Sequence, residues 1–322
     1  MAKDEEGQGD NSTWSDMKFK AHAALLLTLL LSTAFFTTTS CEAISADDWL
    51  NSSKTFYIAG DLDNALYCAE RAIEIDPSFA NAWLFKGASL REEGKLRASI
   101  ASYNRALQIN PKYIDAWNSK GMTLENLGRY EEAINCYDRI IQIEKDSGAS
   151  DSLRDATISK GRVLRELYRY DESIECYDRL ARYNDTLALS EKGITLAYQK
   201  KYDKAMQCFN EALNRTKDHQ DDDSYIRAEI YMGIAFLFLN NSSSALGCFD
   251  EATKSGKSYD RIWTAWFCKA VVLKNLGHTD EAERAFQEAA NLRMKGIQKK
   301  SQFHGFEERI RGLYDILRRT IS

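Results

Sequence analysis

The sequence predicts an all-α solenoid of about seven similar helical hairpins, and three observations carry this prediction. Only two prolines occur in 322 residues, which favours long helices over a turn-rich β fold. Trp49, Trp83 and Trp117 recur at intervals of 34 residues, and Pro77 and Pro111 repeat at the same interval. A fixed period of this length indicates stacked helix–turn–helix units.

The composition excludes two broad classes of protein. Hydrophobic residues make up 44% of the chain and charged residues 28%, which is ordinary for a folded protein and excludes a globally disordered chain. The formal net charge is −5, so the surface as a whole is not basic. We therefore expect no nucleic-acid partner.

The first sixteen residues are polar and acidic and have no apolar periodicity, so we expect residues 1–16 to be disordered. Met17 is an alternative start of translation. The next segment, 17–43, has the pattern of a signal peptide or membrane anchor, because Lys18 and Lys20 precede an uncharged stretch from 21 to 41.

This uncharged stretch is just long enough to cross a bilayer. The basic residues before it favour a cytoplasmic N-terminus, with the repeats exported or anchored outside the cytoplasm. Three fates of the segment stay open: cleavage after Ala43, retention as an anchor, and replacement by a lipid on Cys41.

Carrying the 34-residue register forward defines seven units. They are 46–79, 80–113, 114–147, 154–187, 186–219, 226–259 and 263–296. The eighth position is small in every unit: Ser53, Gly87, Gly121, Gly161, Gly193, Gly233 and Ala270. The twenty-fourth is aromatic in six units: Tyr103, Tyr137, Tyr177, Phe209, Phe249 and Phe286. A small residue on one helix and a large one on the other predict close packing within each hairpin.

The second and third units carry the clearest motif. Its residues are Trp83, Gly87, Gly94, Tyr103, Ala106 and Pro111, and then Trp117, Gly121, Leu124, Gly128, Tyr130, Ala133 and Tyr137. In this pattern the chain resembles the tetratricopeptide repeat family, in a style similar to arrays of methanogenic archaea and some bacteria. The resemblance implies a right-handed α-solenoid of helical hairpins. The chain departs from the family pattern at Tyr168, where glycine is usual in the turn between the two helices.

The C-terminal residues 297–322 are predicted to form a basic amphipathic helix that caps the last unit. One face is apolar: Phe303, Phe306, Ile310, Leu313, Leu317 and Ile321. These spacings of three and four residues are those of one helix face. The basic opposite face leaves a contact with a membrane surface or an acidic partner as the alternative.

Five cysteines occupy the twenty-third position of five units: Cys68, Cys136, Cys176, Cys208 and Cys248. Neighbouring helices lie about 8–10 Å apart, whereas a disulfide needs Cα atoms within about 7 Å. We therefore predict buried free thiols. Metal-ligand spacings and common catalytic motifs are missing from the sequence, so we expect no metal, no cofactor and no enzymatic activity.

A column of lysines stands at the seventh position: Lys86, Lys120, Lys160, Lys192 and Lys269. Two interpretations are open. The lysines form a solvated edge whose aliphatic stems cover the core, or they form a basic strip for an acidic peptide.

The resemblance also places partner binding on the concave side, at positions 2, 5, 9, 12 and 13 of the first helix in each unit, which we call the first-helix surface. In units five to seven this surface is apolar. The candidate partner-binding residues are Leu187, Ile194, Tyr198, Ile230, Ile234, Leu237, Phe238, Phe267 and Val271. Between residues 228 and 239 the only charged residue is Glu229.

Two kinds of occupant fit an apolar surface of this type. One is a peptide or helix of a partner protein. The other is intramolecular: the loop 217–225, a tight superhelix or the C-terminal helix. The sequence thus predicts a non-enzymatic scaffold that binds a protein or peptide outside the cytoplasm, with a structural role in envelope assembly through self-association as the alternative. The oligomeric state stays open.

Overall fold

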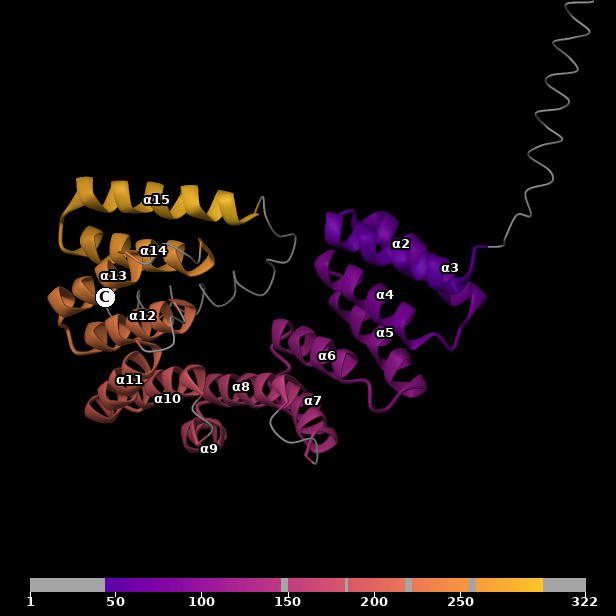
Figure 1. Ribbon diagram of the computed structural model, residues 1–322, viewed down its shortest axis with the longest axis horizontal. Helices are drawn as coiled ribbons and strands as arrows, with labels where there is room; N and C mark the ends of the chain where they lie inside the picture. The colour runs from indigo at the N-terminus through magenta and orange to yellow at the C-terminus, as the bar shows by residue number, and fades with distance from the viewer. Residues whose placement is uncertain (1–43, 146–149, 183–184, 218–221, 255–258, 298–322) are drawn as a thin grey trace, which may run out of the picture. The chain divides into compact units, whose positions relative to one another are not determined.

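The computed structural model describes residues 44–145, 150–182, 185–217, 222–254 and 259–297. These residues form fourteen α-helices and no strand (Figure 1), which confirms the predicted all-α class. The expected disordered segment 1–16, the expected signal or anchor segment 17–43 and residues 298–322 of the expected cap lie outside the described residues.

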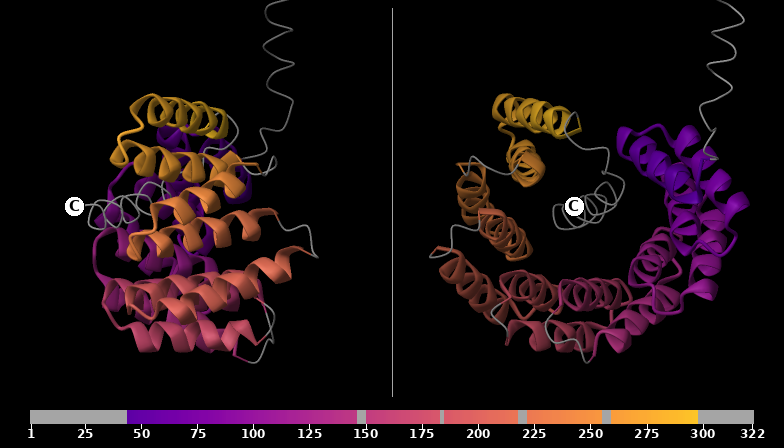
Figure 2. Two further views of the ribbon diagram at one scale, coloured as in Figure 1. Left: turned by 90° about the vertical axis from the view of Figure 1, so that its left-hand side faces the viewer. Right: turned by 45° about the vertical axis from the view of Figure 1, so that its right-hand side comes forward.

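The helices pair into seven consecutive hairpins. They are α2 (Ala46–Ala59) with α3 (Leu62–Ile75), α4 (Ala80–Glu92) with α5 (Leu96–Ile109), α6 (Ile114–Asn126) with α7 (Tyr130–Ile143), α8 (Asp151–Glu166) with α9 (Tyr170–Ala181), α10 (Thr186–Tyr198) with α11 (Tyr202–Lys217), α12 (Asp222–Phe238) with α13 (Ser242–Lys254), and α14 (Tyr259–Asn275) with α15 (Thr279–Ile297). Each hairpin packs on the next (Figure 2), as expected for an α-solenoid.

Three first helices begin before the residue at which the 34-residue register starts their unit. α8 starts at Asp151, because the Ser150 hydroxyl accepts a hydrogen bond of 3.1 Å from the Leu153 backbone N–H and caps the helix there. α12 starts at Asp222 and α14 at Tyr259, each four residues before the unit boundary read from the sequence.

The turn inside every hairpin passes through one residue with positive φ, always at position 15. Glycine supplies it in four units, and Tyr168, Lys200 and Asn240 do so with φ of 60°, 61° and 55° in the other three. The left-handed residue lets its own N–H and the next one bond back to the last carbonyls of the first helix. In the fifth unit these bonds run from Lys200 to Ala197 and from Lys201 to Leu196, both at 2.9 Å.

The cores of five hairpins, in units two to six, confirm the predicted close approach of their two helices. A Cβ atom added to Gly87 would lie 2.5 Å from the ring of Tyr103, and one added to Gly193 would lie 2.5 Å from the ring of Phe209. The same contact recurs in units three, four and six. The five aromatic rings concerned are fully buried, so the small residue and the ring occupy one shared space.

The predicted column of cysteines is confirmed as buried and free. All five members lack a disulfide, and so does Cys268 on α14. Burial raises the pKa of the Cys136 thiol to about 11 and that of Cys248 to about 12. These thiols therefore act as small core side chains.

Candidate functional site

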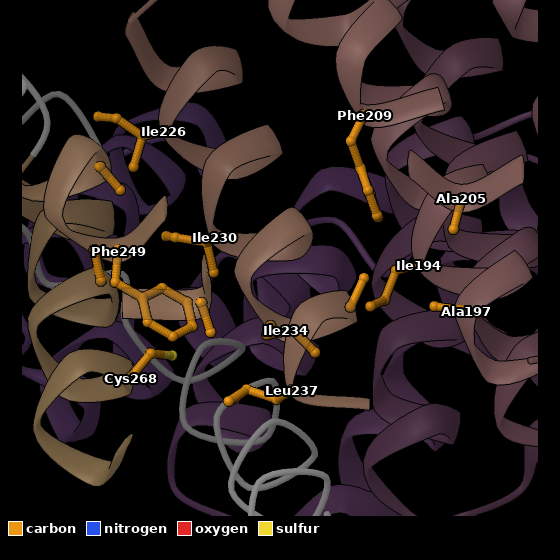
Figure 3. Packing of buried hydrophobic residues seen from close by; sticks show 14 of the residues in the cluster. Ile194, Ala197, Ala205, Phe209, Ile226, Ile230, Ile234, Leu237, Phe249 and Cys268 are labelled. Carbon is orange, nitrogen blue, oxygen red and sulfur yellow. The ribbon is translucent and has the colours of Figure 1, made fainter. Parts of the chain in front are cut away.

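The nine candidate partner-binding residues lie on α10, α12 and α14, but at two depths. Ile194, Ile230, Ile234 and Leu237 are between 1% and 5% exposed and belong to one hydrophobic cluster with Phe209 and Phe249 (Figure 3). The other five are half-buried: Leu187, Tyr198, Phe238, Phe267 and Val271. The structure thus places four of the nine in the core of units five and six and the others at its edge.

Two of the half-buried residues belong to a row of aromatic rings that crosses three units. The ring centroids of Tyr198 and Phe238 are 5.7 Å apart. Tyr170 stacks on Tyr198 at 6.3 Å, and Tyr202 stacks on Phe238 at 6.5 Å. Tyr170, Tyr198, Tyr202 and Phe238 are called the aromatic row below. Contacts of this kind contribute about 0.5–1.5 kcal/mol beyond the area they bury.

The exposed ring of Tyr168 extends the aromatic row at one end. It meets Tyr170 edge to face at 6.1 Å, while 72% of the Tyr168 residue remains exposed. The sequence reading identified Tyr198 and Phe238 but not Tyr170 and Tyr202. Both tyrosines stand at position 17, the start of the second helix, and this shared position was the available signal.

A buried carboxylate, Glu191, lies beside the aromatic row. Its Oε2 atom accepts a hydrogen bond of 2.9 Å from Arg165 on α8, and its Oε1 atom accepts one of 3.1 Å from the Tyr231 hydroxyl on α12. Three successive first helices therefore meet at this carboxylate. Burial raises the pKa of Glu191, but the guanidiniums of Arg165, Arg162 and Arg227 lower it more, to about 2.

Arg165 connects this charged cluster with the aromatic row. Its guanidinium lies 5.9 Å from the ring centroid of Tyr198, a cation–π contact. Arg162, one turn earlier on α8, donates to the Ser159 hydroxyl at 3.0 Å. We call Arg162, Arg165, Glu191 and Tyr231 the Glu191 cluster. The sequence signal for it was a single acid, Glu191, on the otherwise apolar and neutral first half of α10.

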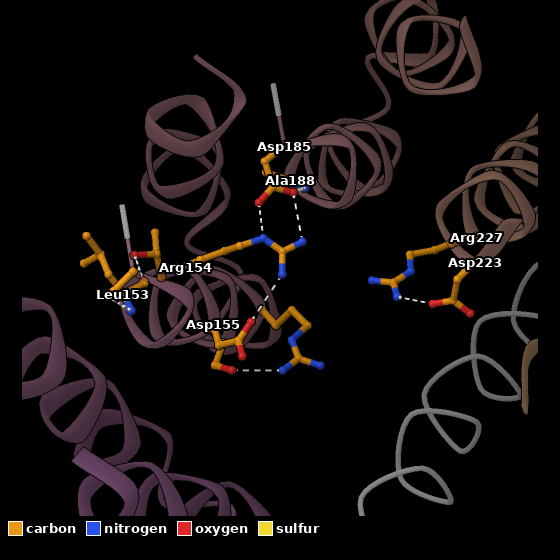
Figure 4. Close-up of polar contacts among 11 residues, drawn as sticks. Leu153, Arg154, Asp155, Asp185, Ala188, Asp223 and Arg227 are labelled. Carbon is orange, nitrogen blue, oxygen red and sulfur yellow. Dashed lines mark hydrogen bonds and ion pairs between the residues drawn. The ribbon is translucent and has the colours of Figure 1, made fainter. Parts of the chain in front are cut away.

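Ion pairs at the helix starts hold α8 and α10 in position around this cluster. Arg154 on α8 binds both carboxylate oxygens of Asp185, and Asp185 also accepts a hydrogen bond of 3.0 Å from the Ala188 backbone N–H (Figure 4). Asp185 is thus both the N-cap of α10 and a bridge to the preceding unit. On α12, Arg227 pairs with Asp223 one turn before it.

The lysine column bridges successive repeats. Four of its members lie 2.5 to 2.9 Å from a carboxylate at position 25 of the preceding unit: Lys86–Glu70, Lys160–Asp138, Lys192–Asp178 and Lys269–Asp250. Asn104 stands at that position before Lys120, and Lys120 instead lies 5.2 Å from the ring centroid of Trp117. The lysines are therefore engaged within the solenoid.

The described residues show neither a metal-binding cluster nor a membrane-spanning helix. They contain no group of three or more His, Cys, Asp and Glu side chains arranged to hold a metal ion. Within the same ranges, no helix has the length and apolar character needed to cross a bilayer.

Comparison with protein families matches most of the described solenoid to repeat models. Residues 87–128 match a TPR repeat model, residues 114–147 match a tetratricopeptide repeat model, and residues 158–222 and 232–296 match a second tetratricopeptide repeat model. Together these matches span more than half of the chain. A search of curated protein sequences finds no match.

Solved structures that are similar to this chain share little sequence with it. A tetratricopeptide repeat protein from Parabacteroides merdae has 16% identity over 86% of this chain and 99% of its own, with a TM-score of 0.60. PilF of Pseudomonas aeruginosa has 18% identity over 65% and 90%, with a TM-score of 0.49. MamA has 18% identity over 53% and 92%, with a TM-score of 0.47. The first of these likenesses shows the fold.

Proposed function

Because this chain belongs to the tetratricopeptide repeat family, we propose that it is a non-enzymatic scaffold that binds a peptide or helix of a partner protein along the first-helix surface of units four to six. Proteins of this family act in protein–protein interaction. The observation that carries the location is the contact of Arg165 with both Glu191 and Tyr198, which joins the charged cluster to the aromatic row.

The chemistry of this surface suits a partner that has both apolar and polar groups. Half-buried aromatic side chains supply large contact areas at a small cost in conformational entropy, and they dominate many interfaces. The arginines beside Glu191 are not fully hydrogen-bonded within the solenoid. Arg162 and Arg165 each hold a buried Nε–H group that meets no acceptor among the described residues. An extended peptide or a helix with both apolar and polar groups suits an aromatic surface that lies beside a charged cluster.

The ion pair at Glu191 supports a role in recognition. Burying an arginine and a glutamate costs several kcal/mol of desolvation, so apolar residues of the same volume would stabilise the solenoid as well or better. The Arg165 side chain is 12% exposed and that of Glu191 is 4% exposed. We infer that the pair is kept because it orients donors toward a partner.

The test is a comparison of matched aromatic substitutions. A partner is first captured with the wild-type chain from the envelope fraction, and its affinity is then measured by calorimetry. We expect Tyr198→Ala and Phe238→Ala to weaken binding about tenfold or more, because aromatic anchors carry most of the energy of such interfaces. Tyr67→Ala, which removes an exposed aromatic from the second helix α3, should leave the affinity unchanged.

The same two variants can also disprove the proposed location of the binding surface. If Tyr198→Ala and Phe238→Ala lower the melting temperature by many degrees and leave the affinity intact, both residues are core and the binding surface lies elsewhere.

We further propose that this scaffold acts outside the cytoplasm. The support is the basic and then uncharged pattern of residues 17–43, which is typical of an export signal or a membrane anchor.

A second candidate function is self-association in the envelope, and one observation favours it. Tyr67 and Ile75 on α3 are half exposed, although both are large and apolar. Exposed apolar groups at the end of a solenoid are suited to contact a second copy. Elution volumes that shift with protein concentration in size-exclusion chromatography would support this candidate, and Ile75→Glu should then abolish the shift.

A further inference from the structure

We propose that residues 301–321 of this chain bind its own first-helix surface in units five to seven and compete there with the partner. The competition rests on the proposed function. The contact of residues 301–321 with the first-helix surface is independent of that function, because no partner takes part in it.

The first observation is the burial of the first helices of units five and six. From residue 223 to residue 238 of α12, no residue is exposed. No charged residue occurs between 230 and 238, and Glu229 is buried. Position 9 is only half-buried in units two to four, where it is Ala88, Met122 and Arg162, but Ile194 and Ile234 at this position are 4% and 1% exposed. The second half of α12 is therefore uncharged on every side, and a helical segment of this kind is normally covered on every side.

The second observation concerns the other place where the C-terminal segment could bind. A capping helix would have to cover the outer face of α15. Every exposed residue of α15 between 279 and 293 is polar or charged except Ala290. An amphipathic segment gains little by burying its apolar stripe against such a face, because the gain is proportional to the apolar area removed from water. The first-helix surface is the apolar alternative within reach.

The length of the segment fits this surface. Residues 301–321 form a helix about 31 Å long if they are helical throughout. Adjacent packed helices lie about 8–10 Å apart, so the path from α14 across α12 and α10 to α8 is roughly 24–30 Å. The apolar stripe of the segment repeats along its whole length, from Phe303 to Ile321. One segment can therefore cover all three units.

The connection favours binding within the chain over binding of a free partner. Only residues 298–300 separate Ile297, the last residue of α15, from the segment. A connection of so few residues gives an effective concentration in the millimolar range. A weak contact is then enough to keep the surface occupied, and a partner must displace the segment in order to bind.

The test uses the full chain with a photo-cross-linking amino acid in place of Ile310, followed by mass spectrometry of the cross-linked peptides. We expect cross-links to α10, α12 or α14 of the same molecule. The same amino acid in place of Asp315, on the opposite side of the predicted helix, is the matched control and should give few. Cross-links from position 310 to α15 would support a cap instead, cross-links between two molecules would support a second copy, and either result overturns the proposal.

The rate of trypsin cleavage tests the same contact without a cross-linker. Ile310→Glu introduces a charge into the apolar stripe and should release the segment, so that trypsin cleaves after Lys299 and Lys300 about tenfold faster, because cleavage follows the population of the open form. His304→Glu adds the same charge outside the stripe and should leave the cleavage rate unchanged. Equal rates in all three chains would overturn the proposal.

These experiments separate the two proposals. A chain that cross-links internally but captures no partner retains the internal contact and loses the proposed function. A chain that binds a partner through Tyr198 and gives no internal cross-link retains the function and loses this inference.

Discussion

At the residue scale, the hairpins depend on pairs of side chains sixteen residues apart. The small residue at position 8 and the ring at position 24 fill one space, as in Gly193 with Phe209 and Gly233 with Phe249. Because the ring is fully buried in each case, it has no free volume into which to move. A single methyl group at position 8 is therefore expected to disturb the whole unit.

The first prediction compares two glycines in helices. Gly193→Ala would place Cβ 2.5 Å from the Phe209 ring and should lower the free energy of unfolding by about 1–3 kcal/mol through overpacking. Gly247→Ala in α13 meets nothing within 4 Å and should raise it by about 0.4–1 kcal/mol, because alanine has the higher helix propensity. Urea unfolding measures the free energy of unfolding of both variants. If the two substitutions change it by the same amount, the packing argument is wrong.

The second prediction concerns the pH dependence set by Glu191. Because its pKa is lowered to about 2 in the folded state, its ionised form stabilises the fold above the unfolded pKa near 4.5, and this stability is lost as the pH falls toward 2. We expect the wild-type chain to lose about 1–3 kcal/mol more than Glu191→Gln between pH 5 and pH 2. Unfolding free energies measured across this range test the difference.

Glu229 provides the opposite case within the same protein. Burial raises its pKa, so its contribution to stability is present at low pH and is lost as the pH rises through the raised value. Replacement of Glu229 by glutamine should therefore flatten the pH profile above pH 4.5 rather than below it. A profile that changes in the same direction for both variants would refute the assignment.

At the element scale, each hairpin needs one left-handed residue between its helices. Four units use glycine and three do not, although the backbone reversal is the same. A side chain in this conformation costs roughly 1–2 kcal/mol, less for asparagine. Neighbouring hairpins are in turn joined by ion pairs of the lysine column, whose exposed members contribute about 0.2–1 kcal/mol each.

The third prediction follows from this turn. Lys200→Gly should raise the free energy of unfolding by about 0.5–1 kcal/mol, because the relief of the left-handed strain exceeds the added chain entropy of glycine. Asn240→Gly should give a smaller gain, since asparagine tolerates this conformation. Denaturant titration of the two variants ranks them, and a destabilised Lys200→Gly chain would show that the lysine side chain has another role.

At the scale of the whole molecule, the solenoid combines two regions of different character. The first-helix surface is mostly polar in units one to four and apolar in units five to seven, and Glu191 lies near the boundary between them. The proposed partner surface spans this boundary, and the proposed site of residues 301–321 lies on its apolar side. Export of the chain would determine which partners the surface can meet.

The fourth prediction tests export. A reporter enzyme that is active only outside the cytoplasm, fused after Ser322, should be active in cells that carry residues 17–43 and inactive when Lys18 to Cys41 are deleted. The expectation rests on the basic and then uncharged pattern of this segment. A fusion that is active only with a cytoplasmic reporter would disprove export.

The sequence by itself determined the repeat architecture. Three features of the sequence are local to one hairpin: helix periodicity, the 34-residue interval and the small–large pairs sixteen residues apart. They can therefore be recognised without knowledge of how the hairpins stack. The buried cysteine column was predictable for the same reason, because equivalent positions in a repeat share one environment. Even the turn at Tyr168 kept its backbone geometry, since the two helices it connects impose the reversal.

Only the tertiary structure decided which residues of different units meet. The bonds of Glu191 join residues 26 and 40 positions away in the chain, and no interval in the sequence marks them. The burial of Ile194, Ile230, Ile234 and Leu237, predicted as a binding stripe, likewise depends on how closely successive first helices approach. That approach is set by the combined volume of side chains from several helices, and a repeat pattern specifies each helix face but not the distance between the faces.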